Sequence, residues 1–404
     1  MATTDKHRWQ FAGRFRRNAF GWRSQPAIQR VREAVSEIKG VARRDPLLGA
    51  DGAVLFLEKV SAALEHVDSS SGAIGTAVNH AIAELVSIIA KAPVDFGRRA
   101  KWLDRLWDAY IADAIPYIET LGDFWGELCA TKELASVWAN NLIEPLRSTW
   151  RDRGTSSYFQ GTAVCLSSLL AAGRYLELLD ILEIAPFVCW ADRRWGVQAL
   201  AAMGKSADAL RYAEASRGLN DHPDAIARAC EEILVSAGRP EEAYERYALA
   251  ANRSGSYLTT YRAIVRKYPH RDPERILRDL VVRTPGDEGK WFAAAKEAGF
   301  LQLAIELAKA SPCDPKTLTR AARDFVETNA VFALETGLTA LHWLEKGYGY
   351  EVTGADVWAA YSNTIRAAER LDRREEVRDR IRALIVPKGF VAQILGRQLG
   401  FPTF

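Results

Sequence analysis

Residues 238–250 read Gly238-Arg-Pro-Glu-Glu-Ala243-Tyr-Glu-Arg-Tyr247-Ala-Leu-Ala250, and they decide the fold of this 404-residue chain. After the break at glycine and proline, small and aromatic residues recur at spacings of four and three, the period of an amphipathic helix. From about residue 157 onward the same period recurs in blocks of 10 to 17 residues, separated by short breaks with Gly, Pro or Asp. Signals for β-hairpins are nearly absent. The sequence therefore predicts an all-α fold.

The breaks between the expected helices recur at regular intervals. Comparable turns carry Gly173, Gly204 and Gly238, which are 31 and 34 residues apart, and a fourth turn at Gly299 follows after a further 61 residues. A period near 34 residues is typical of stacked helical hairpins. Because each hairpin shields only part of its own apolar surface, neighbouring hairpins must stack to complete the core. The rhythm predicts an α-solenoid.

The stretch 238–250 resembles the second half of a tetratricopeptide repeat. In that family a glycine ends the first helix, and a small residue, an aromatic residue and another small residue follow on the second helix. Ala243, Tyr247 and Ala250 match these three places, and Ala227 and Leu234 fit the first helix. The resemblance implies a tetratricopeptide-like α-solenoid over about residues 157–385.

Other units match the repeat only in part. In one unit Ala209 and Ser216 are the small residues, and Ala213 replaces the aromatic one. In another unit Ala304 and Ser311 are the small residues, and Ala308 replaces the aromatic one. The unit that matches best has Glu231 where a small residue is expected, and it lacks the terminal proline. The repeats are therefore degenerate, and the peptide-carboxylate clamp of some family members is not carried over. A fold of this kind says little about function.

Three regions are expected along the chain. A basic aromatic N-terminal arm occupies residues 1–23, an N-terminal helical domain residues 24–150, and a tetratricopeptide-like helical-repeat array residues 151–404. The helices expected in the second region lie near 27–44, 52–66, 76–91, 98–112, 114–128 and 131–147. The chain resembles an uncharacterised bacterial family, and this likeness implies no site residue.

The composition favours a folded cytoplasmic protein. With 48% hydrophobic and 26% charged residues, the chain can bury a large core. The apolar stretch 81–92 is interrupted by Glu84 and Lys91 and is shorter than the roughly 20 residues of a bilayer span, so we expect no membrane helix. The five cysteines lack the spacing of a zinc site or a disulfide framework, and we expect reduced thiols. They are Cys129, Cys165, Cys189, Cys230 and Cys313.

No motif of a known catalytic or metal site occurs. A zinc protease needs two histidines one helical turn apart, whereas the histidines here are isolated, and we interpret His80 and Glu84 as a surface pair on one helix. The histidines are His7, His66, His80, His222, His270 and His342. Gly204-Lys205-Ser206 ends like a phosphate-binding loop, but the preceding glycine is too distant. We expect no enzyme, cofactor or metal. A site built from dispersed carboxylates is the less favoured alternative.

The segment Asp68–Thr76 is rich in serine and glycine and leads into an expected helix. Free amides at a helix N-terminus can hold phosphate, and Ser70, Ser71 and Thr76 can add hydroxyl groups. A flexible connection with Thr76 as the helix cap accounts for the same residues. We favour the second interpretation.

The N-terminus is strongly basic. Residues 1–44 contain eleven Lys/Arg and three Asp/Glu, so the rest of the chain carries a net charge of −5. Cations and aromatic rings alternate in the arm, which suits a nucleic acid because guanidinium groups pair with phosphate and rings stack on unpaired bases. The arm equally suits an acidic protein groove, or a segment docked on the rest of the chain. The candidate contact residues of the arm are Arg14, Arg16, Arg17, Trp22 and Arg23.

In the array, the first helix of each hairpin is expected to line a concave surface, where arginine and aromatic residues are favoured anchors. Trp195 and Tyr261 have even odds of packing between hairpins instead. The candidates are Arg193, Arg194, Arg228, Tyr257, Arg262 and Arg266. We therefore expect a non-enzymatic scaffold or adaptor that binds a protein partner. The alternative is a nucleic-acid-associated protein of a bacterial mobile-element or defence operon that uses the basic arm. The sequence does not indicate the oligomeric state.

Overall fold

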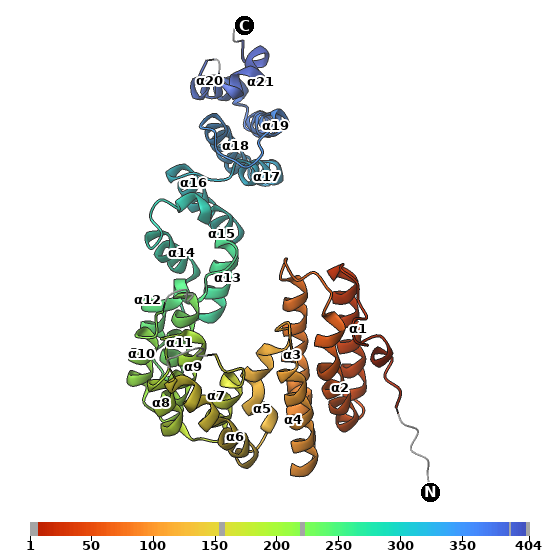
Figure 1. Ribbon diagram of the computed structural model, residues 1–404. Helices are drawn as coiled ribbons and strands as arrows, with labels where there is room; N and C mark the ends of the chain where they lie inside the picture. The colour runs from red at the N-terminus through yellow and green to blue at the C-terminus, as the bar shows by residue number, and fades with distance from the viewer. Residues whose placement is uncertain (1–6, 153–157, 219–222, 388, 401–404) are drawn as a thin grey trace. The chain divides into compact units, whose positions relative to one another are not determined.

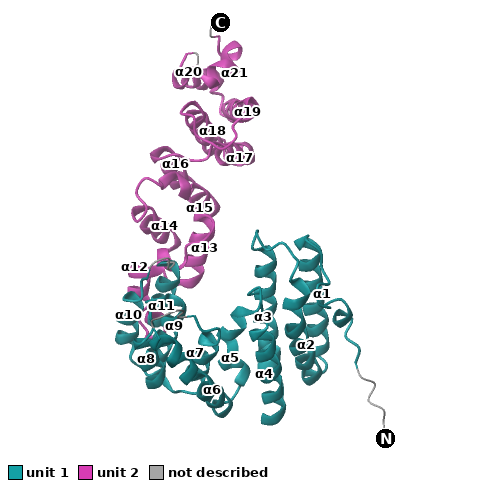
Figure 2. Cartoon of the chain, viewed as in Figure 1, with its two compact units in different colours: residues 1–233 teal, residues 234–404 magenta. Residues whose placement is uncertain are grey.

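The computed structural model describes residues 7–152, 158–218, 223–387 and 389–400 (Figure 1). Every regular element in these ranges is a helix, and they contain no strand. The prediction of an all-α chain is confirmed. The chain divides into two compact units, residues 1–233 and 234–404 (Figure 2). The boundary between the units lies at residues 233 and 234, later than the boundary expected at residue 150. The expected boundary concerns the start of the repeats, and it stays a prediction.

Among the described residues, the first unit contains two short 3-10 helices and ten complete α-helices. In chain order these are η1 (Phe11–Gly13), α1 (Ser24–Ala42), α2 (Pro46–Leu64), α3 (Ala73–Lys91), α4 (Phe96–Ile111), η2 (Glu119–Phe124), α5 (Trp125–Cys129), α6 (Lys132–Arg151), α7 (Thr162–Ala171), α8 (Tyr175–Glu183), α9 (Trp190–Ala202) and α10 (Ser206–Glu214). Helix α11 (Pro223–Ser236) crosses the boundary between the units.

The second unit continues the helical pattern to the end of the described chain. Its elements are α12 (Pro240–Ala251), α13 (Tyr257–Lys267), α14 (Pro273–Val282), η3 (Glu288–Trp291), α15 (Phe292–Glu297), α16 (Leu301–Ala310), α17 (Pro315–Phe325), α18 (Ala330–Glu345), α19 (Gly354–Arg370), α20 (Arg374–Leu384) and α21 (Phe390–Leu399).

Five of the six helices expected between residues 24 and 150 are confirmed, as α1, α2, α3, α4 and α6. The prediction of one helix over 114–128 is wrong, because only η2 and the short α5 form there. Pro116 removes a backbone donor early in this stretch. At Gly122 a β-carbon would lie 2.9 Å from the Tyr110 hydroxyl, so the chain passes close to α4 where only glycine fits.

The four glycine turns noted in the sequence share one hydrogen-bond geometry. Gly173, Gly204, Gly238 and Gly299 have φ values of 77°, 74°, 72° and 84°, in the left-handed region. In each turn the glycine N–H donates to the carbonyl three residues earlier, and the next N–H donates to the carbonyl five residues earlier. This arrangement satisfies the last carbonyls of one helix and reverses the chain. The next helix begins two residues after every one of these glycines.

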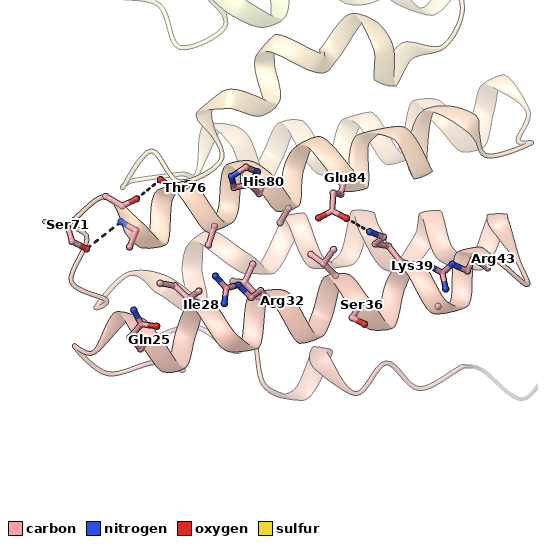
Figure 3. A pocket seen from close by; sticks show the side chains of 17 residues that line it. Gln25, Ile28, Arg32, Ser36, Lys39, Arg43, Ser71, Thr76, His80 and Glu84 are labelled. Atoms are coloured by element: carbon pink, nitrogen blue, oxygen red, sulfur yellow. Dashed lines mark hydrogen bonds and ion pairs between the residues drawn. The ribbon is translucent and has the colours of Figure 1, made fainter. Parts of the chain in front are cut away.

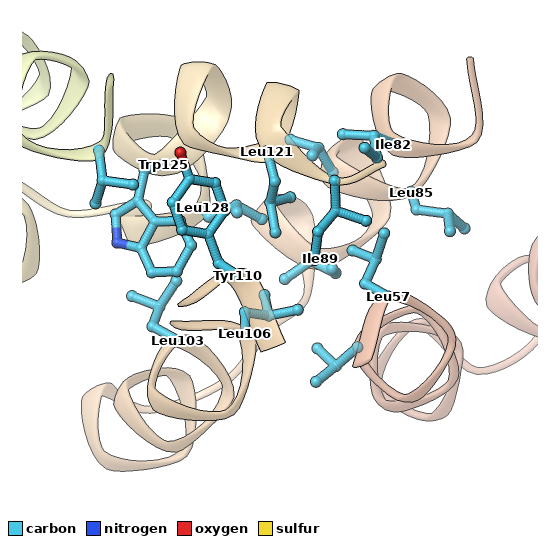
Figure 4. Close-up of a cluster of buried hydrophobic side chains, with 14 of the residues drawn as sticks. Leu57, Ile82, Leu85, Ile89, Leu103, Leu106, Tyr110, Leu121, Trp125 and Leu128 are labelled. Atoms are coloured by element: carbon cyan, nitrogen blue, oxygen red, sulfur yellow. The ribbon is translucent and has the colours of Figure 1, made fainter. Parts of the chain in front are cut away.

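Large aromatic residues fill the core of the first unit. Trp125 is fully buried between helices, and its ring meets Trp138 of α6 edge-on at 4.9 Å between centroids. Figure 4 shows this ring beside Tyr110 and among leucine and isoleucine side chains of the preceding helices. In the second unit, Phe292 stacks on Phe332 at 6.2 Å. Bulky rings thus fill the space between helices in both units.

A buried arginine joins the ends of two helices in the first unit. Arg99 of α4 is 5% exposed, and its guanidinium group donates to four carbonyl oxygens at 2.8–3.2 Å. Three of the carbonyls belong to the C-terminal end of α3, at Ile89, Ala90 and Ala92, and the fourth is Leu128 of α5. Such carbonyls lack partners within their own helix and form its negative end, so a cation satisfies them.

Helix α3 is long and apolar enough to cross a bilayer, judged by length and composition alone. In the structure its residues Ile74, Val78 and Ile82 are buried against other helices of the first unit. A buried core helix has the same composition, so this feature is weak evidence for a membrane location.

We expect Gly204→Ala to lower the free energy of unfolding of the first unit by about 1–2 kcal/mol, because an L-residue is strained in the left-handed region. No atom lies within 4 Å of the added β-carbon, so strain is the only cost. The control is Gly40→Ala within α1, which also meets nothing within 4 Å and should raise stability by about 0.5–1 kcal/mol. Urea unfolding followed by circular dichroism measures both changes, and equal effects of the two would contradict this account of the turns.

Candidate functional site

A groove runs between α1 and α3 on the first unit (Figure 3). Its volume is about 990 Å³. The two helices run in the same direction, since Gln25 of α1 lies at the end that holds Ser71, whereas Lys39 lies beside Glu84. Both helix N-termini therefore meet at one end of the groove, and their dipoles make that end electropositive.

Short side chains on α3 leave the space between the helices open. Ala73, Ala77 and Ala81 line the groove at intervals of four residues, and they face Ile28 and Val35 of α1. Larger residues at these alanine positions would fill the seam, as ridges normally fill grooves between packed helices. The result is an apolar floor along the length of the two helices.

The rim of the groove is mostly basic. Arg32, Lys39 and Arg43 follow one another along α1 at intervals of seven and four residues, so they lie on one face. Lys39 forms an ion pair with Glu84 of α3 across the groove. In the described part of the chain Arg32 and Arg43 form no ion pair, and both are exposed. Two guanidinium groups are thus free to meet an anionic partner.

The loop before α3 closes the electropositive end of the groove. Asp68 accepts a hydrogen bond from the Ser70 amide at 3.0 Å, which lowers the pKa of this carboxyl. The Ser71 hydroxyl accepts from the Ala73 amide at 3.4 Å, and Thr76 donates to the Gly72 carbonyl at 3.0 Å. The prediction that Thr76 caps the helix is wrong, because Gly72 in the left-handed conformation takes the cap position. The loop's hydroxyl groups shape the turn.

The groove unites features that the sequence places far apart. His80 and Glu84 both line it, but Glu84 pairs with Lys39 rather than with His80, so the expected pair on one helix is replaced by a pair between helices. Among the described residues no three His, Cys, Asp or Glu side chains come together as metal ligands. His222, one of the isolated histidines, lies outside the described residues.

The N-terminal arm, described from His7 onward, packs against α1 and α2. Trp9, Phe11 and Phe15 are buried, and both phenylalanine rings contact Phe56 of α2 edge-on at 5.8 and 5.1 Å. Gly52 of α2 makes room for the Trp9 ring, since a β-carbon there would lie 2.2 Å from it. The structure thus describes a docked segment, which is one of the three alternatives for the arm.

The cations of the arm stay at the surface. Arg14 pairs with Glu33 at 3.0 Å and Arg17 with Glu65 at 3.6 Å, whereas Arg16 and Arg23 are exposed. Trp22 is 72% exposed. The rings of Trp9, Phe11 and Phe15 cannot stack on bases while they are buried, so the arm offers fewer base-stacking faces than its sequence indicates.

The array candidates divide between the two units. In the first unit, Arg193 lies over the Tyr212 ring at 4.6 Å, and Arg194 pairs with Asp123 of η2. Arg228 is exposed on α11. Trp195 is buried, as expected if it packs between helices.

In the second unit, the three remaining candidates share α13. Tyr257 packs edge-on against Trp291 at 4.7 Å and donates its hydroxyl proton to Asp287. Arg262 donates two hydrogen bonds to the Glu297 carboxylate, and Arg266 is exposed. Tyr261 is buried. Tyr257 and Arg262 therefore already have partners within this unit.

Sequence reasoning missed Arg32, Lys39 and Arg43 as site residues. Their spacing along a predicted helix was a usable signal, because it places three cations on one face. What could not be foreseen is that α3 lies parallel to α1 and offers a row of alanines opposite them.

Comparison with models of known protein families finds no match, and comparison with curated protein sequences finds none either.

We expect Phe15→Ala to lower the stability of the first unit by about 3–5 kcal/mol, the usual cost of removing a buried ring. Trp22→Ala removes an exposed ring from the same arm and should change stability by less than about 0.5 kcal/mol. Hydrogen–deuterium exchange of α1 and α2 distinguishes the two variants. Equal exchange in both would mean that the arm is not docked in solution.

Proposed function

We propose that this chain is a non-enzymatic scaffold whose α1–α3 groove binds an acidic helical segment of a partner protein. One observation carries the proposal: an open, apolar-floored groove flanked by two exposed arginines without ion-pair partners in the described chain. Amphipathic helices commonly bind in such grooves, with the apolar face on the floor and charged residues at the rim.

The length of the groove suits a helix. A second hollow of about 450 Å³ shares Lys39, Arg43 and Glu84 with the groove and extends it to Pro46 and Lys91. Helix α1 has 19 residues and is therefore about 28 Å long at 1.5 Å per residue. A partner helix of about 18 residues would cover the whole seam.

The charge of the groove favours an acidic partner. Arg32, Lys39, Arg43 and Lys91 outnumber the single carboxylate, Glu84, and that carboxylate is paired with Lys39. Complementary charge speeds association and excludes basic partners. The dipoles of two helix N-termini add to the same preference.

We further propose that the hairpins closed by the left-handed glycines form a tetratricopeptide-like array. The array and the groove would together make the chain an adaptor. The repeated turn geometry at Gly173, Gly204, Gly238 and Gly299 supports this proposal. Stacked hairpins bury a continuous core and serve as rigid binding frameworks. The absence of a catalytic motif from the sequence is consistent with a role that depends on binding alone.

A designed peptide tests the groove. The probe is an 18-residue amphipathic helix with leucine on one face and glutamate beside it, and the comparison peptide carries lysine in place of glutamate. We expect the acidic peptide to bind the full chain at least about tenfold more tightly at low salt, measured by fluorescence anisotropy. Arg32→Glu with Arg43→Glu should weaken its binding about tenfold.

The matched control is Arg30→Glu with Arg44→Glu. This pair changes the net charge equally and lies on or next to the same helix, but neither residue lines the groove. We expect the control to bind the acidic peptide within about twofold of the unaltered chain. Equal losses in both double variants would show that overall charge, and not the groove, attracts the peptide. Tighter binding of a single-stranded oligonucleotide than of the acidic peptide, lost in the Arg32/Arg43 variant, would favour nucleic acid as the partner.

A further inference from the structure

Another cavity, of about 510 Å³, lies in the first unit apart from the groove and the hollow that extends it. Its walls come from η2, from the start of α9 with the residues before it, and from residues 158–163. The volume falls in the range of small-molecule sites. It is independent of the α1–α3 groove, because the two share no lining residue.

One wall of the cavity is fixed by a reciprocal pair of hydrogen bonds. The Tyr110 hydroxyl donates to the Gln160 carbonyl at 3.0 Å, and the Gln160 side-chain amide donates to the Tyr110 carbonyl at 2.6 Å. These bonds hold the chain at Gln160 against the end of α4. The cavity therefore has a defined wall on this side.

Aromatic rings line much of the cavity. Tyr110, Trp150 and Phe159 contribute to its walls, and Tyr158 and Phe187 lie at its rim with 68% and 70% of their surface exposed. Large exposed rings around a concavity are typical of binding sites. Ring faces carry partial negative charge and attract cations.

The polar residues of the cavity carry an excess of negative charge. Glu119, Asp123 and Asp192 line it together with a single cation, Arg194. Arg194 is committed to Asp123 by an ion pair, and its Nε donates to the Ala191 carbonyl at 2.9 Å. Within the described residues neither Glu119 nor Asp192 has a hydrogen bond or ion pair through its carboxylate.

The electrostatics of neighbouring groups agree with this excess. Burial raises the pKa of Asp192, Arg194 opposes the rise, and Asp123 adds to it. Burial also raises the pKa of Tyr110, and Glu119 adds to that rise. A cation placed beside Asp192 would offset the cost of burying this carboxylate, which Arg194 offsets in part, and its repulsion by Asp123.

We propose that this cavity binds an alkylammonium ion, with the ammonium group at Asp192 and Glu119 and the alkyl chain against the aromatic rings. The ammonium group can come from a free aliphatic amine or from a lysine side chain. Both present the same chemistry: three N–H donors on a flexible apolar stem.

Three matched probes test the charge requirement: pentylamine, pentanol and pentanoate, titrated into the full chain and followed by ligand-observed NMR. We expect pentylamine to bind at least about tenfold more tightly than pentanol, because a hydrogen bond to a charged group is worth about one power of ten or more in affinity. Pentanoate should bind least. Equal binding of amine and alcohol overturns the proposal.

Variants locate the binding site. Asp192→Asn and Glu119→Gln should each weaken pentylamine binding about tenfold and leave pentanol binding unchanged, whereas Phe187→Ala should weaken both. The control is Asp180→Asn, an exposed carboxylate of α8 that does not line the cavity. The helical signal in circular dichroism shows whether each variant is folded. Two carboxylate variants are used so that the test still works if one of them fails to fold. If Asp192 only stabilises the first turn of α9, Asp192→Asn will lower stability but leave pentylamine binding intact, and the proposal is then wrong.

The source of the ammonium group is distinguished by two further probes. Cadaverine represents a free amine, and Nα-acetyl-lysine methylamide represents a lysine side chain with its backbone. Tighter binding of the lysine derivative assigns the cavity to a protein ligand, and tighter binding of cadaverine assigns it to a free amine. Failure of both to bind more tightly than pentanol contradicts the proposal. Neither result bears on the acidic partner of the α1–α3 groove.

Discussion

A left-handed glycine that ends one helix and reverses the chain is the constraint on which four of the helical hairpins depend. At Gly173, Gly204, Gly238 and Gly299 the same two hydrogen bonds form, and the following helix begins two residues later each time. The spacing from one helix to the next is therefore set locally, before any packing between hairpins. An L-residue at such a position would have to adopt a conformation that costs about 1–2 kcal/mol, which explains why glycine marks the rhythm. Four of the helix-to-helix connections thus share one backbone geometry.

A second constraint separates apolar from charged side chains at the N-terminus. The rings of Trp9, Phe11 and Phe15 pack into the core around Phe56, and the neighbouring arginines remain at the surface. Beside this docked arm, α1 presents Arg32 and Arg43 to the groove that the alanines of α3 leave open. The excess positive charge of the first 44 residues is thereby divided between the arm and one side of a groove. The adaptor role proposed for the chain depends on the positive charge beside the groove.

The sequence predicted the fold class and the turns better than it predicted the site. The glycine turns were visible because their signal is local, and five of the six helices expected before residue 150 were found for the same reason. The error at 114–128 arose where Pro116 and the close approach of Gly122 to Tyr110 break a helical pattern. Threonine is a good capping residue, which favours Thr76 as the cap, yet Gly72 occupies the cap position. The groove and the aromatic cavity were not foreseen, since each is formed by segments whose contact depends on tertiary packing.

Site-specific photo-crosslinking in the native source can identify what binds the α1–α3 groove, for which we propose an acidic helix of another protein. A photoreactive residue replaces Ser36, which lines the groove, or Gln29, an exposed residue of α1 that does not. Mass spectrometry then identifies the crosslinked segment. We expect a crosslink from position 36 alone, to an acidic amphipathic segment, and we expect it to be lost when Arg32 and Arg43 are replaced by glutamate. Equal crosslinking from both positions, or a crosslinked segment that is basic or is a nucleic acid, would contradict the proposal.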